Sequence, residues 1–212
     1  MQKPYFTVEE PFENTVVISK SRFITTLMPI KDYDDAISKV KAISKKYGDA
    51  THNCYAFISN QSATEQRFSD DGEPQGTAGT PMLEVLKKRN VYMTLAVVTR
   101  YFGGIKLGAN GLVGAYSSSV GEALDKAKTV KMIWADVLQI TVSYAIYKKV
   151  EEACVNGGGQ VESVEYGNDV TLTVAIPQQV ARDTVAKIVD ITLDKAKIET
   201  LRSDYVAFNA SI

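Results

Sequence analysis

The sequence VYMTLAVVTRYFGGIKLGANGLVGAY, residues 91–116, runs from an apolar stretch directly into a glycine-rich one. Residues 91–101 are apolar over enough positions to predict a buried strand at the centre of a sheet. Five glycines follow between residues 103 and 114, and glycine permits positive φ angles and close backbone approach. Beyond them the apolar spacing predicts a helix from about Asn110 to Lys128, with an inward face of Val113, Tyr116, Val120, Ala123, Leu124 and Ala127.

The same region is locally cationic. Between Val85 and Gly114 there is no acidic residue, whereas there are five basic ones: Lys87, Lys88, Arg89, Arg100 and Lys106. A helix N-terminus presents unpaired N–H groups to an anion. One interpretation is therefore a contact with a phosphate of RNA or of a nucleotide, and the other is tight helix–sheet packing with solvated lysines. The spacing fits neither the dinucleotide fingerprint nor the P-loop, because Ala109-Asn110 stand where the P-loop has Lys-Ser/Thr.

A second unusual segment is RFSDDGEPQGTAGTPM, residues 67–82, which is long for a connection and which we expect to be a polar loop. Thr80-Pro81 has the composition of an N-cap and first turn, so a short helix is expected from there to about Arg89. The acidic residues predict a solvated turn that caps backbone N–H groups, with metal binding as the less favoured alternative. The candidate site residues of this loop are Ser69, Asp70, Asp71, Gly72, Glu73 and Thr77.

His52 is the only histidine, and it shares a strand face with Cys54. A Cys–His nucleophile pair would need an orienting third group, and a metal site would need three or four convergent ligands. We expect both residues to belong to the core or to an edge strand. The sequence accordingly predicts no catalytic residue, no metal and no cofactor.

The composition is that of a globular protein of one large or two small domains. The chain has 212 residues, 45% of them hydrophobic, and a formal net charge of −1. Two cysteines a hundred positions apart offer no disulfide framework, and neither a signal peptide nor a membrane span is recognisable. We therefore expect a cytoplasmic protein whose nucleic-acid contacts, if it has them, form a local patch.

The coarse order of elements divides the chain in two. In the first half, a helix over 33–47 is predicted with Asp32 as its cap, and 52–59 predicts a strand. The second half predicts the order βαββαβ, which is typical of ferredoxin-like domains; its elements are residues 137–144, 145–156, 160–166, 170–176, 178–190 and 196–206. We place the boundary near Ala135–Asp136, giving domains 1–135 and 136–212. The fold class is α+β.

Four segments of the sequence resemble the IMPACT family, and most closely its bacterial YigZ-type members: KSRF at 20–23, HNCYAF at 52–57, RFSDDGEPQGTAGTPML at 67–83 and VVTRYFGGIKLGANGLVGAY at 97–116. The resemblance spans the whole chain. It implies a first domain similar to the second domain of ribosomal protein S-five and to domain IV of elongation factor G. It implies a ferredoxin-like second domain similar to domain V of that factor. In this family a glycine usually stands in place of Asn110 and an arginine in place of Gly114.

The resemblance implies a non-catalytic protein that contacts a ribosome, a structured RNA or a translation factor. Eukaryotic members regulate a translation-controlling stress kinase, partly through a domain that this sequence lacks. The residues expected to contact the anion are Arg67, Arg100, Gly103, Gly104, Lys106 and Asn110. Two alternatives stay open. One is a small-molecule enzyme with a kinase-like phosphate site, and the other is a protein–protein regulator.

Overall fold

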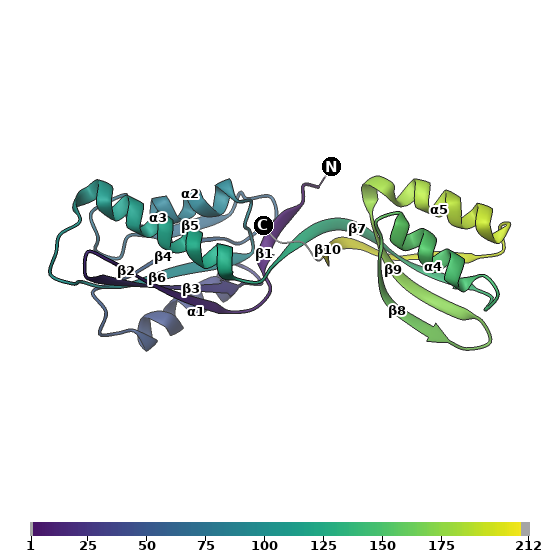
Figure 1. Ribbon diagram of the computed structural model, residues 1–212, viewed down its shortest axis with the longest axis horizontal. Coiled ribbons are helices and arrows are strands. Elements are labelled where there is room, and N and C mark those ends of the chain that lie inside the picture. The colour runs from purple at the N-terminus through teal and green to yellow at the C-terminus, as the bar shows by residue number, and fades with distance from the viewer. Residues whose placement is uncertain (1, 209–212) are drawn as a thin grey trace. The chain divides into compact units, whose positions relative to one another are not determined.

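The computed structural model describes residues 2–208, which form two compact units (Figure 1). Tyr5–Lys131 make the N-terminal unit, and Met132–Phe208 with residues 2–4 make the C-terminal unit. The chain is a mixture of helices and strands, as the α+β prediction requires. Among the described residues, none of the helices has the length and apolar character needed to cross a membrane.

The N-terminal unit is built on an antiparallel sheet in the order β2-β3-β6-β4-β5. Its strands are β2 (Phe12–Ile18), β3 (Ser21–Pro29), β4 (His52–Ile58), β5 (Gln66–Ser69) and β6 (Thr94–Tyr101). The strand predicted from residues 91–101 is confirmed as the central one, because β6 lies between β3 and β4 and all but its last residue are buried. Strand β1 (Tyr5–Val8) precedes this sheet in the chain, and strand β7 (Thr129–Val142) leads from this unit into the next.

Helices cover both faces of this sheet (Figure 1). α2 (Gly79–Lys88) and α3 (Gly108–Lys126) pack on the face that carries Phe23, Cys54 and Val98. α1 (Tyr33–Lys46) packs on the other face, and the Asp35 amide donates to the Asp32 carboxylate at 2.8 Å, so the predicted cap is confirmed.

The polar segment 67–82 is only partly a loop. Residues 66–69 form β5 and pair with β4, and α2 begins at Gly79, so the connection itself is residues 70–78. The prediction that Thr80 caps this helix was wrong. The N-cap residue is Ala78, and the side chain that accepts the first free amides is Asp70, which lies eight positions earlier in the chain.

Helix α3 begins two residues before the predicted start. Tyr116, Val120, Ala123 and Leu124 are buried as expected, but Val113 is 37% exposed, so its assignment to the core was wrong. The helix follows a turn in which Gly103 passes very close to another segment. A Cβ at that position would lie 1.9 Å from the Lys20 carbonyl oxygen, so the turn between β2 and β3 leaves room only for glycine there.

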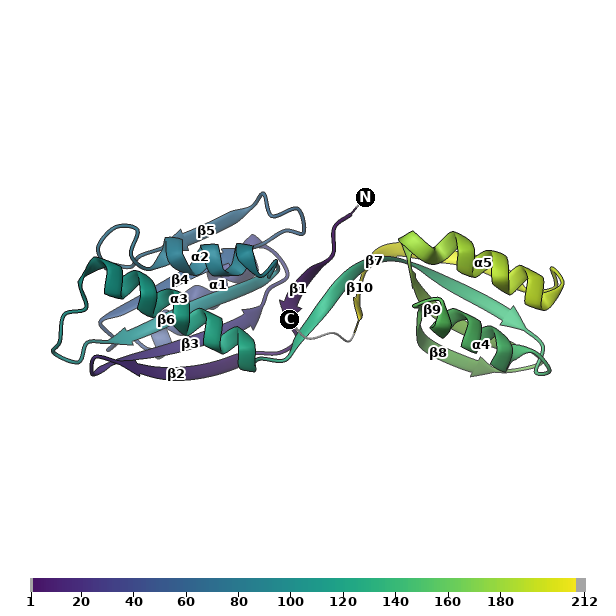
Figure 2. The ribbon, with the colours of Figure 1, turned by 45° about the horizontal axis from the view of Figure 1, so that its top comes forward.

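The C-terminal unit has the predicted βαββαβ order. β7 is followed by α4 (Tyr147–Asn156), β8 (Gln160–Tyr166), β9 (Val170–Pro177), α5 (Gln178–Thr192) and β10 (Lys197–Phe208), and the sheet order is β10-β7-β9-β8. α4 and α5 lie on the same face of the sheet (Figure 2). β7 starts eight residues before the predicted 137–144 strand, so the boundary suggested near Ala135–Asp136 falls inside this strand.

Candidate functional site

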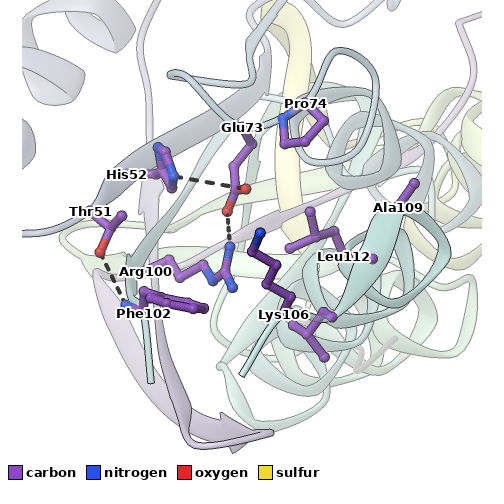
Figure 3. Close-up of a pocket in the computed structure, with 11 residues that line it drawn as sticks. Thr51, His52, Glu73, Pro74, Arg100, Phe102, Lys106, Ala109 and Leu112 are labelled. Carbon is purple, nitrogen blue, oxygen red and sulfur yellow. Dashed lines mark hydrogen bonds and ion pairs between the residues drawn. The ribbon is translucent and has the colours of Figure 1, made fainter. Parts of the chain in front are cut away.

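A pocket of about 300 Å³ lies in the N-terminal unit where β4 and β6 meet the start of α3 (Figure 3). Both glycine-rich segments contribute to it, and we call it the α3 pocket. Its lining residues are Thr51, His52, Glu73, Pro74, Arg100, Phe102, Lys106, Leu107, Gly108, Ala109 and Leu112.

A tight turn places Glu73 in this pocket. The Glu73 amide donates to the Asp70 carbonyl at 2.9 Å, and the two residues between them, Asp71 and Gly72, have φ angles of 42° and 84°. Positive φ at both central positions defines a type I′ turn, for which Asp-Gly is a favoured pair. The sequence DDGE therefore fixes the direction in which the Glu73 side chain leaves the loop.

The two aspartates of the turn accept backbone N–H groups, as the sequence predicts. The Asp70 carboxylate accepts from the amides of Gly76, Ala78 and Gly79 at 2.8, 3.0 and 2.8 Å. The Asp71 carboxylate accepts from the Asn53 amide at 2.6 Å. Asp70 therefore ties the loop to the start of α2, and Asp71 ties it to β4.

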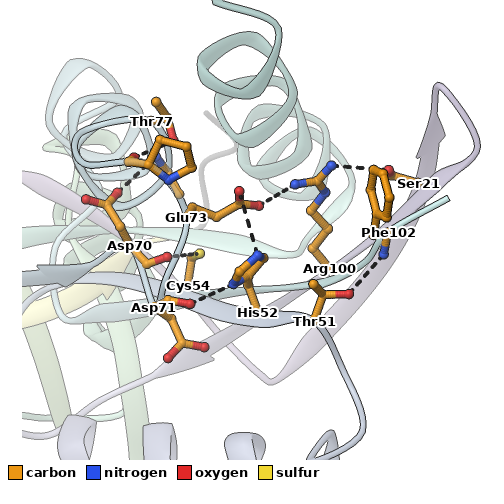
Figure 4. A network of polar contacts seen from close by, with 12 residues as sticks. Ser21, Thr51, His52, Cys54, Asp70, Asp71, Glu73, Thr77, Arg100 and Phe102 are labelled. Atoms are coloured by element: carbon orange, nitrogen blue, oxygen red, sulfur yellow. Dashed lines mark hydrogen bonds and ion pairs between the residues drawn. The ribbon is translucent and has the colours of Figure 1, made fainter. Parts of the chain in front are cut away.

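Glu73 is not solvated, in contrast to the predicted acidic turn. It is 8% exposed, and Arg100 Nη1 donates to its Oε1 at 2.6 Å (Figure 4). The Tyr116 hydroxyl donates to the same oxygen at 2.8 Å, and Arg100 Nη2 donates to Ser21 Oγ at 3.3 Å. Arg100 is itself 5% exposed, so this is a buried ion pair in which four segments of the unit meet. Arg100 is thus held by Glu73 rather than presented to solvent.

His52 connects the turn to the ion pair. Its Nδ1 lies 2.7 Å from the Asp71 carbonyl oxygen, which can only accept, so Nδ1 carries a proton. Nε2 lies 3.8 Å from Glu73 Oε2 on the pocket wall. The imidazole therefore has one nitrogen fixed by backbone and the other facing a carboxylate.

The opposite wall of the pocket is cationic. Lys106 is exposed and forms no ion pair with any residue in the range 2–208. α3 begins two residues later, and no side chain caps its N-terminus. The first N–H groups of a helix lack intrahelical partners and carry about half a positive charge. Gly108 and Ala109 line the pocket together with Lys106, so the first turn of α3 and a lysine lie at the same pocket.

The remaining candidates are placed as follows. Arg67 is cross-strand to Phe57, on the α1 face of the sheet, where it donates to the Tyr33 hydroxyl; it is therefore not part of the α3 pocket. Asn110 is exposed on the first turn of α3. Gly104 has a φ of 87° in the turn before α3, Ser69 Oγ accepts from the Asp71 amide, and the buried Thr77 donates to the Pro74 carbonyl.

Three of the five basic residues between Val85 and Gly114 form ion pairs with carboxylates. Lys87 pairs with Glu84 at 3.3 Å, Arg89 pairs with Asp125 at 2.5 Å, and Arg100 pairs with Glu73. Of the five cations that the sequence draws attention to, only Lys88 and Lys106 have no ion pair within the described residues. Only Lys106 of these two faces the α3 pocket.

The surroundings of Cys54 do not activate its thiol as a nucleophile. Its thiol lies 2.9 Å from the Asp70 carbonyl oxygen and 3.4 Å from the Tyr116 hydroxyl, and burial raises its pKa to about 12. Burial also raises the pKa of Tyr116, with further contributions from Cys54 and Glu73. Within residues 2–208, no three His, Cys, Asp or Glu side chains converge as metal ligands would. The chemistry that this arrangement supports is the binding of an anion.

Several residues of the site were not predicted from the sequence, among them Tyr116, Ser21 and Phe102. Tyr116 was expected only as a core residue, whereas its hydroxyl also donates a hydrogen bond to the Glu73 carboxylate. Ser21 accepts from both Arg100 and the Gly103 amide. Phe102 is 47% exposed on the pocket rim, and an aromatic residue between a strand end and Gly103-Gly104 was a signal that could have indicated it.

Comparison with known proteins covers both units. Residues 19–124 match the Impact N-terminal domain, and residues 140–195 match a domain of unknown function (DUF1949). "IMPACT family member YvyE" of Bacillus subtilis is 38% identical over 199 residues, which are 94% of this chain and 92% of that protein. "IMPACT family member YigZ" of Escherichia coli is 36% identical over 82% of this chain and 87% of its own length.

More distant relatives match a smaller share of the chain. Human "Protein IMPACT" is 34% identical over 111 residues, which cover 48% of this chain and 34% of the human protein. A solved structure titled "Crystal structure of an hypothetical protein" superimposes with a TM-score of 0.60 at 31% identity, over 95% of this chain and 99% of the other.

Proposed function

The chain belongs to the IMPACT family, and on that premise we propose that it is a non-catalytic, cytoplasmic protein that binds RNA, on the ribosome or as structured RNA, through the α3 pocket. One observation carries the proposal. The unpaired Lys106 and the uncapped first turn of α3 both line a pocket that is also lined by the buried Arg100. Fixed backbone amides with a neighbouring cation are a common arrangement for holding a phosphate.

The distribution of charge supports an RNA contact in the N-terminal unit. Residues 5–131 carry 16 Lys and Arg against 14 Asp and Glu, a formal charge of +2. Residues 2–4 and 132–208 carry 8 against 11, a formal charge of −3. An anionic polymer is therefore attracted to the first unit and repelled by the second.

We also propose that the two units correspond to the domain pair implied by the sequence resemblance. The C-terminal strand order β10-β7-β9-β8, with a helix after the first and third strands of the unit, supports a ferredoxin-like domain. A pair similar to domains IV and V of a translocation factor would suit a partner in translation.

The test is fluorescence anisotropy with a labelled RNA at several salt concentrations. For each phosphate that a cation neutralises, log K falls by about 0.7 to 0.9 per unit of log salt. Lys106→Ala should therefore weaken binding and make this slope shallower by about that amount. Lys41→Ala is the matched control, because Lys41 is an exposed lysine on α1, which packs on the opposite face of the sheet.

Equal slopes for the two variants would remove Lys106 from the interface. RNA affinity that does not change between low and moderate salt would overturn the proposal. Fractionation of the tagged protein with ribosomes, before and after nuclease treatment, provides the cellular arm. Retention on a protein partner after complete RNA digestion would favour the alternative of a protein–protein regulator.

A further inference from the structure

We propose that the ligand of the α3 pocket is a nucleoside carrying a phosphate monoester, with its phosphate at Lys106 and the first turn of α3 and its base against Phe102. Such a group is found at a phosphorylated end of an RNA chain or as a free nucleotide. The inference rests on the proposed function and narrows it from RNA in general to this terminal group.

The charge of the pocket matches a monoester better than a backbone phosphate. The formal charges of Lys106, Arg100 and Glu73, which all line the pocket, sum to +1. The helix N-terminus adds about half a charge, for a total near +1.5. A phosphate monoester carries about −1.5 to −2 at pH 7, whereas each phosphate within an RNA chain carries −1.

Arg100 provides a second, independent indication of a ligand. Its side chain is 6% exposed and lines the pocket, and Nη1 and Nη2 have partners. Nε, in contrast, is buried with no hydrogen-bond acceptor among the described residues. Buried donors are nearly always satisfied, and a bound ligand or an ordered water would supply the acceptor that this N–H lacks.

The shape of the pocket favours a chain end. Its floor is buried, formed by Glu73, Arg100 and Leu112, while Phe102, Lys106 and Ala109 on the rim are exposed. A terminal phosphate can enter such a hollow with its free oxygens first. A phosphate within a chain must leave room for the backbone on both sides, and a volume of about 300 Å³ is at the small end of ligand pockets.

Phe102 provides a surface for the base. Its ring is 47% exposed and lies outside the hydrophobic core, and its backbone amide donates to Thr51 Oγ1 at 3.0 Å, which fixes the position of the residue. The Arg100 guanidinium lies 5.5 Å from the ring centroid. Stacking of one base on an aromatic ring corresponds to roughly 5- to 150-fold in affinity.

The experiment compares short single-stranded RNAs that differ only at their ends: 5′-phosphate, 3′-phosphate, and hydroxyl at both ends. Adenosine monophosphate and inorganic phosphate are tested as competitors. We expect a phosphorylated end to bind about 10- to 100-fold more tightly than the hydroxyl form, on the basis of charge-assisted hydrogen bonds. Phe102→Ala should lower that affinity, and should abolish the advantage of adenosine monophosphate over inorganic phosphate.

Phe68→Ala is the matched control, because Phe68 is 45% exposed on β5 and does not line the pocket. RNA that binds equally well with and without terminal phosphates would overturn this inference and leave the proposed function standing. Binding of adenosine monophosphate without binding of any RNA would support the monoester site and overturn the RNA function. Equal losses from Phe102→Ala and Phe68→Ala would remove the base contact.

Discussion

Replacing Glu73 by glutamine should strongly destabilise the N-terminal unit. The carboxylate is the only acidic group that pairs with Arg100 within the described residues, at 2.6 Å, and the side chains of the two residues are 3% and 6% exposed. Glu73→Gln keeps an oxygen for the Tyr116 hydroxyl but leaves the guanidinium charge buried without a counterion.

The magnitude follows from that burial. Removing one partner of a buried ion pair costs about 3–5 kcal/mol, because the other charge stays desolvated. With a slope of about 1–3 kcal/mol per molar urea, the midpoint of unfolding should fall by about 2 M. Replacing both partners, in Glu73→Leu with Arg100→Met, should recover most of this loss, since an apolar pair of similar volume can substitute for a buried salt bridge.

The assay is urea unfolding followed by circular dichroism and by amide hydrogen exchange in β6. Trp134, the only tryptophan, belongs to the C-terminal unit, so its fluorescence separately reports on that unit. Glu84→Gln is the control, because its ion pair with Lys87 is solvent-exposed and should contribute less than about 1 kcal/mol. An unchanged midpoint for Glu73→Gln would show that Arg100 is not desolvated, and the account of the pocket floor would be refuted.

Gly103→Ala should lower the free energy of unfolding by about 3 kcal/mol, because its Cβ would overlap the Lys20 carbonyl; Gly114→Ala, with open space around it, should raise the same quantity by about 0.5–1 kcal/mol. Thermal melts that shift in the same direction for both would contradict this. Asp70→Ala removes the acceptor of three loop and helix amides, so hydrogen exchange at the start of α2 should accelerate; unchanged exchange would mean that Asp70 is not the cap. Burial raises the pKa of Cys54 from 9.0 to about 12, so the folded state retains a proton that the unfolded state releases, and the stability provided by this group is lost as pH rises from 9 to 12. The Cys54 thiol should therefore react with a disulfide reagent at pH 8 only in urea, and rapid native labelling would refute its burial.

Local signals predicted much of this fold. The apolar run LAVV within β6 indicated a buried central strand, and the Asp32 cap indicated where helix α1 begins. The two strands expected over 160–166 and 170–176 form the β8–β9 hairpin. In each case the residues that decide the structure lie within a few positions of it.

The errors came from contacts between distant residues. Thr80-Pro81 is a good local N-cap signal, but α2 starts at Gly79 because Asp70 reaches its first amides from a turn nine residues away. The pairing of Glu73 with Arg100 depends on a register that brings His52 opposite Arg100 in neighbouring strands, which no local pattern specifies. Val113 has helical spacing but is 37% exposed.

The most direct test of the phosphate site is a titration of the isotopically labelled protein with adenosine monophosphate, followed by the backbone amide resonances. We expect the amides of Gly108, Ala109 and Asn110 to shift the most, and Lys106→Ala to reduce these shifts while Lys41→Ala does not. Saturable shifts confined to other surfaces, with the first turn of α3 unaffected, would contradict it.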